Sequence, residues 1–146
     1  MSAAPLRFVL NPTGDELAAA KRCEADVFLE TYGNTAEEFE VEYGPYADAT
    51  GFMTILQDDG EAVATLRVIA PGAAGLKSLN DVSREPWCVD GVRSARAAGV
   101  EVERTWDIAT IAVRRGGGRG GLCAAALYHG IVSAALAHDV EYIVMI

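Results

Sequence analysis

Residues 113–122 bring five glycines and three arginines together in one short run, Val-Arg-Arg-Gly-Gly-Gly-Arg-Gly-Gly-Leu. An apolar stretch of strand character precedes this run, and an alanine-rich stretch of helical character follows it. A glycine-rich loop that leads into a helix exposes backbone N–H groups, and it lies at the positive end of the helix dipole. The pattern therefore predicts an anion site, most often one for phosphate groups.

Two common phosphate loops fit this run poorly. The Walker A loop needs a lysine and a serine or threonine after its last glycine, and Leu122 and Cys123 stand there instead. The dinucleotide pattern GxGxxG is present as Gly116, Gly118 and Gly121. That pattern normally follows the first strand of its fold and needs an acidic residue at the end of the next strand. The run lies late in this chain, so a dinucleotide-binding domain is the weakest alternative.

A third pattern, Arg-x-x-Gly-x-Gly, is present at Arg115, Gly118 and Gly120. With the strand before it and the helix after it, this pattern resembles the acyl-CoA pyrophosphate loop of the GNAT acyltransferase superfamily. The resemblance implies that acetyl-CoA or a longer acyl-CoA is the co-substrate. It also implies that loop N–H groups hold the pyrophosphate, while the preceding strand binds the pantetheine arm and the acyl carbonyl. The cofactor-binding residues implied in this way are Ile111, Ala112, Val113, Arg114, Arg115, Gly116, Gly117, Gly118, Arg119, Gly120 and Gly121.

Three further segments resemble one branch of that superfamily, the acyl-homoserine-lactone synthases and the related N-acyl amino acid synthases. They are residues 22–28 (RCEADVF), 64–68 (ATLRV) and 105–113 (TWDIATIAV). In the third segment, Ala109 and Thr110 replace the serine and the arginine of that branch. The departure argues against lactone synthesis and leaves acyl transfer unaffected, because the cofactor loop is separate. The branch also implies an acyl carrier protein as an alternative donor, although the glycine-rich loop favours free CoA.

Transfer of an acyl group from a thioester to an amine needs a base that deprotonates the ammonium group. The candidate catalytic residues are Asp107, on the strand that would carry the acyl group, and Glu42. Arg67 stands among apolar residues of a strand, and a buried unpaired charge is very costly. We therefore expect Arg67 to meet a carboxylate, either Asp107, Asp48 or one from an amino acid substrate. The candidate substrate-binding residues are Arg67, Asp48 and Arg22.

Periodicity and turn signals predict the elements that position these residues. An Asp-Gly turn at 59–60 joins two strands, and Thr35 with Glu38 forms a capping box that starts a short helix. Strands are predicted at 6–10, 51–56, 62–70, 101–113 and 141–146, and further helices at 15–31, 92–98 and 122–138. The last strand–helix–strand unit predicts a parallel pair. The fold class expected is α/β or α+β, a GNAT-like three-layer αβα fold with a mixed, mainly antiparallel central sheet.

Composition and charge limit the classes of partner. The net charge of −9 argues against a nucleic-acid partner. Three widely spaced cysteines without a CxxC pair predict neither a disulfide framework nor a metal site. The sequence shows no leader pattern and no apolar run of about 18 residues, which predicts a cytoplasmic protein with no membrane partner. A homodimer is left open.

Residues 1–146 are expected to form a single domain, and the apolar ending Val-Met-Ile predicts further C-terminal strands beyond it. The sequence as a whole predicts an acyl-CoA-dependent N-acyltransferase that acts on a small-molecule amine or an amino acid. The alternative from a different class is a GNAT-like module that binds acyl-CoA without turnover.

Overall fold

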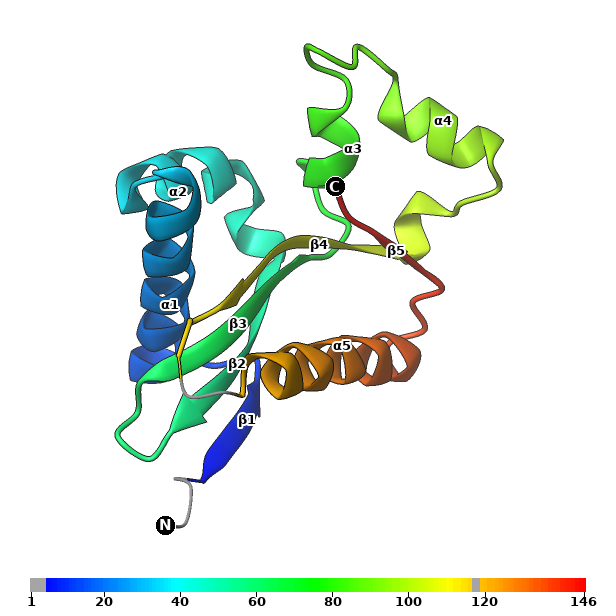
Figure 1. The fold of residues 1–146 in the computed structure, drawn as a ribbon. Coiled ribbons are helices and arrows are strands. Elements are labelled where there is room, and N and C mark those ends of the chain that lie inside the picture. Colours follow the sequence, from blue (N-terminus) through cyan, green and yellow to red (C-terminus); the bar gives the residue numbers. More distant parts are fainter. Residues whose placement is uncertain (1–4, 117–118) are drawn as a thin grey trace.

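The computed structural model describes residues 5–116 and 119–146 (Figure 1). The strands are β1 (Leu6–Leu10), β2 (Thr50–Gln57), β3 (Ala62–Ile69), β4 (Thr105–Val113) and β5 (Tyr142–Val144). The α-helices are α1 (Gly14–Tyr32), α2 (Ala36–Tyr43), α3 (Lys77–Asp81), α4 (Gly91–Ala97) and α5 (Gly120–Ala137). Short 3-10 helices are present at Gly44–Ala49 and Val102–Arg104.

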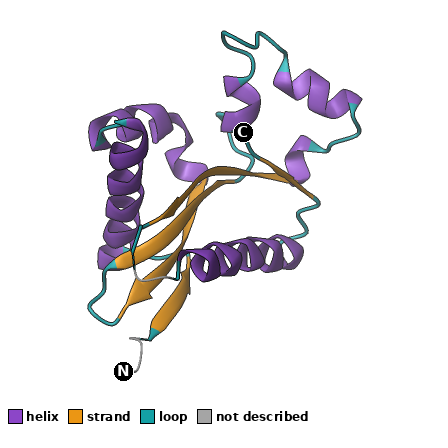
Figure 2. Cartoon of the chain, in the orientation of Figure 1, coloured by secondary structure: helices purple, strands orange, loops and turns teal. Residues whose placement is uncertain are grey.

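The described strands form one sheet in the order β1-β2-β3-β4-β5 (Figure 2). The first four strands pair antiparallel, and β5 pairs parallel to β4. The predicted mixed, mainly antiparallel sheet is therefore confirmed. The predicted capping box is also confirmed, because Thr35 Oγ1 accepts a hydrogen bond from the N–H of Glu38 and the Glu38 carboxylate accepts one from the N–H of Thr35.

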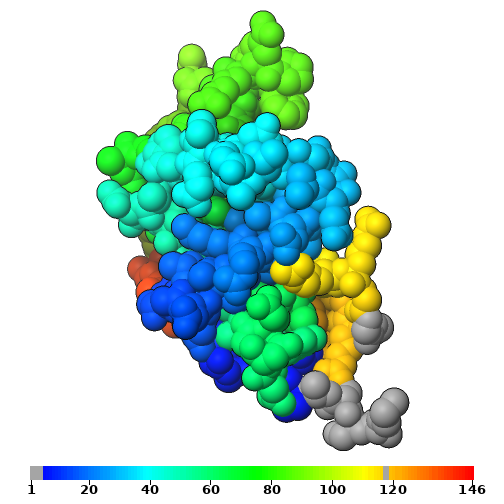
Figure 3. All heavy atoms as spheres, turned by 90° about the vertical axis from the view of Figure 1, so that its left-hand side faces the viewer, coloured from blue at the N-terminus to red at the C-terminus, as the bar shows by residue number. Residues whose placement is uncertain are grey.

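Helices α1 and α2 cover one face of the sheet, which Figure 3 shows from outside in blue and cyan. Side chains alternate between the two faces along a strand. On β3, Thr65, Arg67 and Ile69 therefore point to the α1 face. Ile69 packs there with Phe39 and Tyr43 of α2. Most of the polar and charged side chains discussed below lie on this face.

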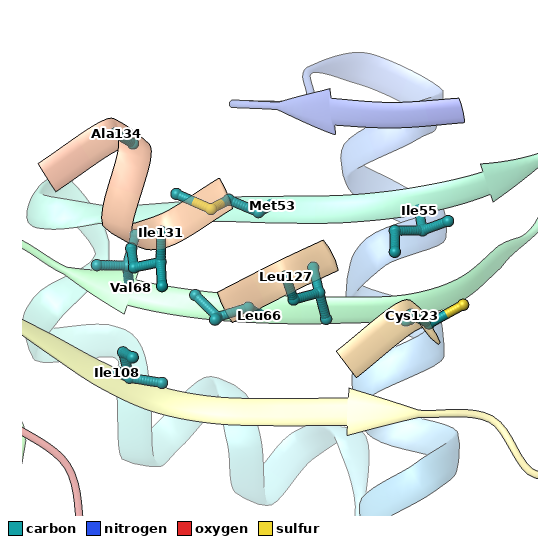
Figure 4. Packing of buried hydrophobic residues seen from close by; sticks show 10 residues of the cluster. Met53, Ile55, Leu66, Val68, Ile108, Cys123, Leu127, Ile131 and Ala134 are labelled. Carbon is teal, nitrogen blue, oxygen red and sulfur yellow. The ribbon is translucent and has the colours of Figure 1, made fainter. Parts of the chain in front are cut away.

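Helix α5 covers the opposite face of the sheet, and the largest apolar cluster lies beneath it (Figure 4). Leu127 and Ile131 of α5 pack there against Met53 of β2 and Leu66 of β3. Helices on both faces of the sheet confirm the predicted three-layer arrangement.

Two element boundaries differ from the prediction for identifiable reasons, and one helix was not predicted. Helix α5 begins at Gly120, because the last two glycines of the run form its first turn. Strand β4 begins at Thr105, because residues Val102–Arg104 form a 3-10 turn. Helix α3 was not predicted, and it is only five residues long. Figure 1 shows that α3 and α4 project from one end of the sheet, as a long connection between β3 and β4.

The expectation that the chain holds no long apolar run is wrong for α5. Residues Gly120–Ala137 are 18 residues without a charged side chain, long and apolar enough by length and composition alone to cross a membrane. The core helix of a soluble protein passes the same test. Cys123, Leu127, Ile131, Ala134 and Ala135 of α5 are buried against the sheet. These residues make up one face of α5, and 28% of the helix is buried, while Leu122, Val132 and Leu136 are exposed.

Shortening a buried side chain of α5 should lower the stability of the protein much more than shortening an exposed one. We expect Leu127→Ala to destabilise the protein by about 2–5 kcal/mol, because Leu127 is fully buried and its removal leaves a cavity. The matched control Leu136→Ala, on the same helix, should cost about 0.5 kcal/mol or less, since Leu136 is 75% exposed. Urea denaturation of both variants measures the difference, and equal losses would contradict the observed packing of α5.

Candidate active site

Strand β4 is paired along only part of one edge. Its pairing with β3 runs from Val113 opposite Ala64 to Asp107 opposite Ile69. On the other edge, β5 pairs only with residues 105–107. Among the described residues, the rest of that edge, 108–113, has no strand partner. The chain after β5 turns away from the direction of β4 (Figure 1). Within the part of the chain that the structure describes, the backbone groups of 108–113 that face away from β3 are therefore available to a partner.

The open edge begins at an irregularity of β4. Arg67 pairs with Thr110 and Val68 with Ile108, so that Ala109 is an extra residue on β4. Such a bulge bends its strand and re-aims the side chains beside it, and bulges are common next to active sites. The bulge lies two residues beyond the last pair of β4 with β5. The bulge and the end of the β4–β5 pairing thus lie together, where the open edge of β4 starts.

The glycine loop continues directly from the end of this edge. Helix α5 follows with Arg119 as its N-cap, and Arg119 makes no side-chain capping bond. The first N–H groups of a helix have no acceptor within the helix. A cavity of about 190 Å³ adjoins this turn, lined by Gly116, Arg119, Gly120 and Cys123 among others. Two residues of the predicted loop, Gly117 and Gly118, lie outside the described residues.

The three arginines of the loop have different surroundings. Arg114 is engaged by protein groups: its Nε donates to the carbonyl oxygen of Ala62 at 2.9 Å, and its Nη2 lies 2.8 Å from a carboxylate oxygen of Asp26 on α1. The prediction of Arg114 as a cofactor ligand therefore has little support, because its charge is already paired. Arg115 is exposed, and Arg119 lines the cavity.

Asp107 is fully buried and is held by a single residue of α3. One carboxylate oxygen accepts the Ser78 N–H at 2.6 Å, and the other accepts the Ser78 hydroxyl at 2.7 Å. Burial raises the pKa of Asp107, and the two bonds from Ser78 partly oppose that rise. The carboxylate thus caps the first turn of α3 and ties the α3–α4 connection to β4. This geometry favours a structural role over the expected role as a base.

Arg67 finds its carboxylate on α1, and the expectation of Asp107 or Asp48 is wrong. Its Nε and Nη2 donate to the two carboxylate oxygens of Glu24 at 2.9 and 2.6 Å, and both side chains are almost fully buried. Thr110 of β4 donates its hydroxyl to the same carboxylate. The guanidinium carbon lies 4.2 Å from the ring centre of Tyr43 and 4.7 Å from that of Phe52.

Sequence reasoning missed Glu24, although a signal was present. Glu24 lies four residues after Ala20 and four before Phe28, on the apolar side of α1. Residues four apart share one face of a helix. A carboxylate inside an apolar helical stripe needs a buried cation, and Arg67 inside an apolar strand needs a buried anion. The two requirements together predict the pair.

The other predicted site residues lie apart from the loop and from one another. Glu42 pairs at 2.6 Å with Lys77, a nearly buried lysine that the sequence analysis did not single out, beside a cavity of about 650 Å³. Asp48 is exposed in the 3-10 turn before β2. Arg22 is exposed on α1, where its only bond in the described residues is a long one, 3.4 Å, to Glu61.

Two solved structures have similar folds. FeeM, an N-acyl amino acid synthase from uncultured soil microbes, superposes with a TM-score of 0.69 at 17% sequence identity, covering 97% of this chain and 71% of FeeM. A Desulfovibrio desulfuricans protein assigned to the GNAT family as an acetyltransferase superposes with a TM-score of 0.56 at 15% identity, covering 97% of this chain and 72% of that protein. The chain has the GNAT fold. No protein-family model matches the sequence, and a search of curated proteins finds no relative.

The comparison confirms the resemblance seen in the sequence at the level of the fold. FeeM is an N-acyl amino acid synthase. Residues 22–28, 64–68 and 105–113 of this chain are the segments that resemble this branch. All three segments supply the buried network described above, since Glu24 belongs to the first, Arg67 to the second and Thr110 to the third. The third contains the bulge and the open edge of β4.

The Glu24–Arg67 pair should be essential to the stability of this GNAT fold. We expect Glu24→Gln to destabilise it by about 3–5 kcal/mol, because Arg67 would keep a buried charge without its counter-charge. The control Glu61→Gln removes the exposed pair with Arg22 and should cost less than about 1 kcal/mol. Urea denaturation of both variants provides the test, and a Glu24→Gln variant as stable as Glu61→Gln would contradict the buried pair.

The three thiols should differ in reactivity as their burial does. Burial raises the pKa of Cys23 to about 11, so that its thiol stays protonated at pH 8. Cys123 is buried, whereas Cys88 is exposed. We expect iodoacetamide at pH 8 to modify native protein at Cys88 first, because the thiolate is the reactive form and must be accessible. Mass spectrometry of the Cys88→Ser variant checks this, and rapid modification of Cys23 in that variant would disagree with its placement.

Proposed function

We propose that this protein transfers an acyl group from acyl-CoA to the amine of a small molecule or an amino acid. The observation that supports this most strongly is the open edge of β4, which leads directly into the glycine loop and the start of α5. The strand edge offers hydrogen-bonding groups to an extended ligand, and the loop and helix start that follow it offer N–H donors to an anion. An acyl-CoA has the same order of groups, a pantetheine arm with two amides followed by a pyrophosphate.

Each part of the donor has a proposed binding partner in this chain. The pantetheine amides pair with backbone groups of Ile111–Val113, as an added strand would pair with a sheet edge. The pyrophosphate lies against the first turn of α5 and the side chain of Arg119, where the helix dipole favours negative charge. The thioester then lies near the bulge at Ala109, and backbone N–H groups there polarise its carbonyl.

The chemical step is aminolysis of the thioester. The neutral amine attacks the carbonyl carbon, the C–S bond breaks, and the CoA thiolate leaves and takes up a proton. Positioning of the thioester and stabilisation of the oxyanion need no titratable side chain. Of the two carboxylates expected as bases, Asp107 is buried and both its oxygens accept bonds from Ser78. We retain Glu42, whose side chain is 46% exposed although it pairs with Lys77.

The sealed position of Asp107 also supports a second candidate function, an acyl-CoA-binding module without turnover. The two functions share the donor site and differ only in the release of CoA. Acetyl-CoA and longer acyl-CoAs, incubated with a panel of amines and amino acids, distinguish them through thiol release. The Cys88→Ser variant should be used, because it removes the exposed protein thiol. Release that depends on the acceptor supports the enzyme, and CoA binding without any release supports the module.

A negative charge introduced at the start of α5 tests whether the CoA pyrophosphate binds there. We expect Gly120→Glu to weaken CoA binding roughly tenfold or more, because its carboxylate would lie where the pyrophosphate binds. Gly120 has room for a side chain, since an added Cβ would lie 3.7 Å from Val113. The control Ala125→Glu places the same charge on an exposed position further along α5 and should leave affinity unchanged. Isothermal titration calorimetry measures both.

Acyl-pantetheine, which lacks the pyrophosphate, makes this experiment specific. Gly120→Glu should leave its turnover nearly unchanged, because its contacts are restricted to β4. The same comparison bears on the donor, since an acyl carrier protein presents the pantetheine arm and no nucleotide. Equal weakening of CoA and pantetheine by Gly120→Glu, or no weakening of either, would place the pyrophosphate elsewhere.

A further inference from the structure

A cavity of about 330 Å³ lies on the α1 face of the sheet, beneath α1 and α2 and over β2. Its lining includes Arg67, with the rings of Phe39, Tyr43 and Phe52. None of the loop residues 114–116 and 119–121 is among its lining residues, and the helix that covers the other face does not contribute to it. The cavity is therefore separate from the proposed acyl-CoA site.

Arg67 enters this cavity with part of its hydrogen-bonding capacity unused by Glu24. A guanidinium has five N–H donors, and the pair with Glu24 uses one on Nε and one on Nη2. Nη1 takes part in neither bond. Only 5% of Arg67 is exposed, and the rings of Tyr43 and Phe52 lie within 4.7 Å of its guanidinium carbon. The cation is thus fixed in position, as a preorganised donor for a planar anion such as carboxylate.

The remaining walls define the other part of a ligand. Phe39, Tyr43 and Phe52 provide aromatic surface next to Arg67. Burial raises the pKa of Tyr43 to about 12, so its phenol stays neutral at physiological pH. Lys21 lies at the rim, and its pair with Glu40 is long, 3.6 Å, with both side chains largely exposed. The lysine can therefore turn toward an entering anion at little cost.

We propose that this cavity binds a small organic carboxylate with an apolar body. The carboxylate accepts hydrogen bonds from Nη1 of Arg67, and the apolar body packs against Phe39, Tyr43 and Phe52. Glu40 lines the same cavity and pairs with Lys21, and the lysine attracts the anion when it turns from this long pair toward the cavity. The proposal does not depend on acyl transfer, because the site shares no loop residue with the proposed acyl-CoA site.

The first test uses hydrocinnamate, a phenyl ring on a short carboxylate chain, and calorimetry on the whole chain. Its amide, hydrocinnamamide, has the same shape without the charge and should bind roughly tenfold more weakly, since a hydrogen bond to a charged group is lost. Addition of CoA should leave the affinity for hydrocinnamate unchanged. Equal binding of the carboxylate and the amide, or no binding of either, would overturn the proposal.

Two variants locate the binding. Arg67→Lys keeps a cation for Glu24 but removes Nη1, so hydrocinnamate affinity should fall roughly tenfold. Gly44→Leu leaves Arg67 and Glu24 intact and fills the cavity from its edge, since Gly44 lines it, has a helical backbone and has no atom near an added Cβ. It should abolish binding without loss of stability, and this second variant decides the question if Arg67→Lys does not fold. Unchanged affinity in Gly44→Leu would refute the location.

Two matched variants on α1 test whether Lys21 at the rim of the cavity contributes to binding. Lys21→Met should weaken hydrocinnamate binding by a few-fold, since it removes the mobile positive charge. Arg22→Met removes the adjacent exposed charge, whose partner is Glu61 on the β2–β3 turn, and should have no effect. Equal losses in the two variants would show a general effect of charge on α1 and would contradict a directed role of Lys21.

Discussion

Every backbone N–H and C=O of a strand needs a hydrogen-bond partner, and among the described residues most of β4 has a strand partner on one edge only. Strand β3 pairs with residues 107–113 apart from Ala109, while β5 pairs with residues 105–107 alone. The extra residue Ala109 lies where this second pairing ends. The open edge then leads to the loop and to the start of α5, whose first N–H groups have no acceptor within the helix. The proposed donor site follows from this one constraint, because a bound chain would satisfy the groups that β5 leaves free.

The buried charges of the α1 face keep this geometry in place. Glu24 joins α1 to β3 through Arg67 and to β4 through Thr110, one residue beyond the bulge. Asp107 joins β4 to α3 through Ser78, two residues before the bulge. Buried carboxylates on either side of Ala109 are thus fully engaged by the protein. Both fix the backbone of β4, which agrees with a site whose chemistry depends on main-chain groups.

Patterns among neighbouring residues predicted most of the helices and strands. Contacts between side chains far apart in the sequence could not be predicted in this way. The Asp-Gly turn and the Thr35 capping box each depend on neighbouring residues, and both are confirmed. Helix α3 was missed because its first turn is capped by Asp107, 29 residues away in sequence. The partner of Arg67 was misassigned for the same reason, since Glu24 lies 43 residues before it. The glycine run was readable because its chemistry is contained in ten consecutive residues.

Hydrogen–deuterium exchange with and without CoA, resolved to single amides by NMR, tests the donor site most directly. The account predicts slower exchange at the N–H groups of Ile111 and Val113, which face the open edge, and of the first turn of α5, 119–122, when CoA is bound. Amides of the β1–β2 pair should exchange at the same rate in both states, because that pair lies at the opposite side of the sheet. Protection confined to other segments, with unchanged exchange along β4 and at the start of α5, would contradict the central claim.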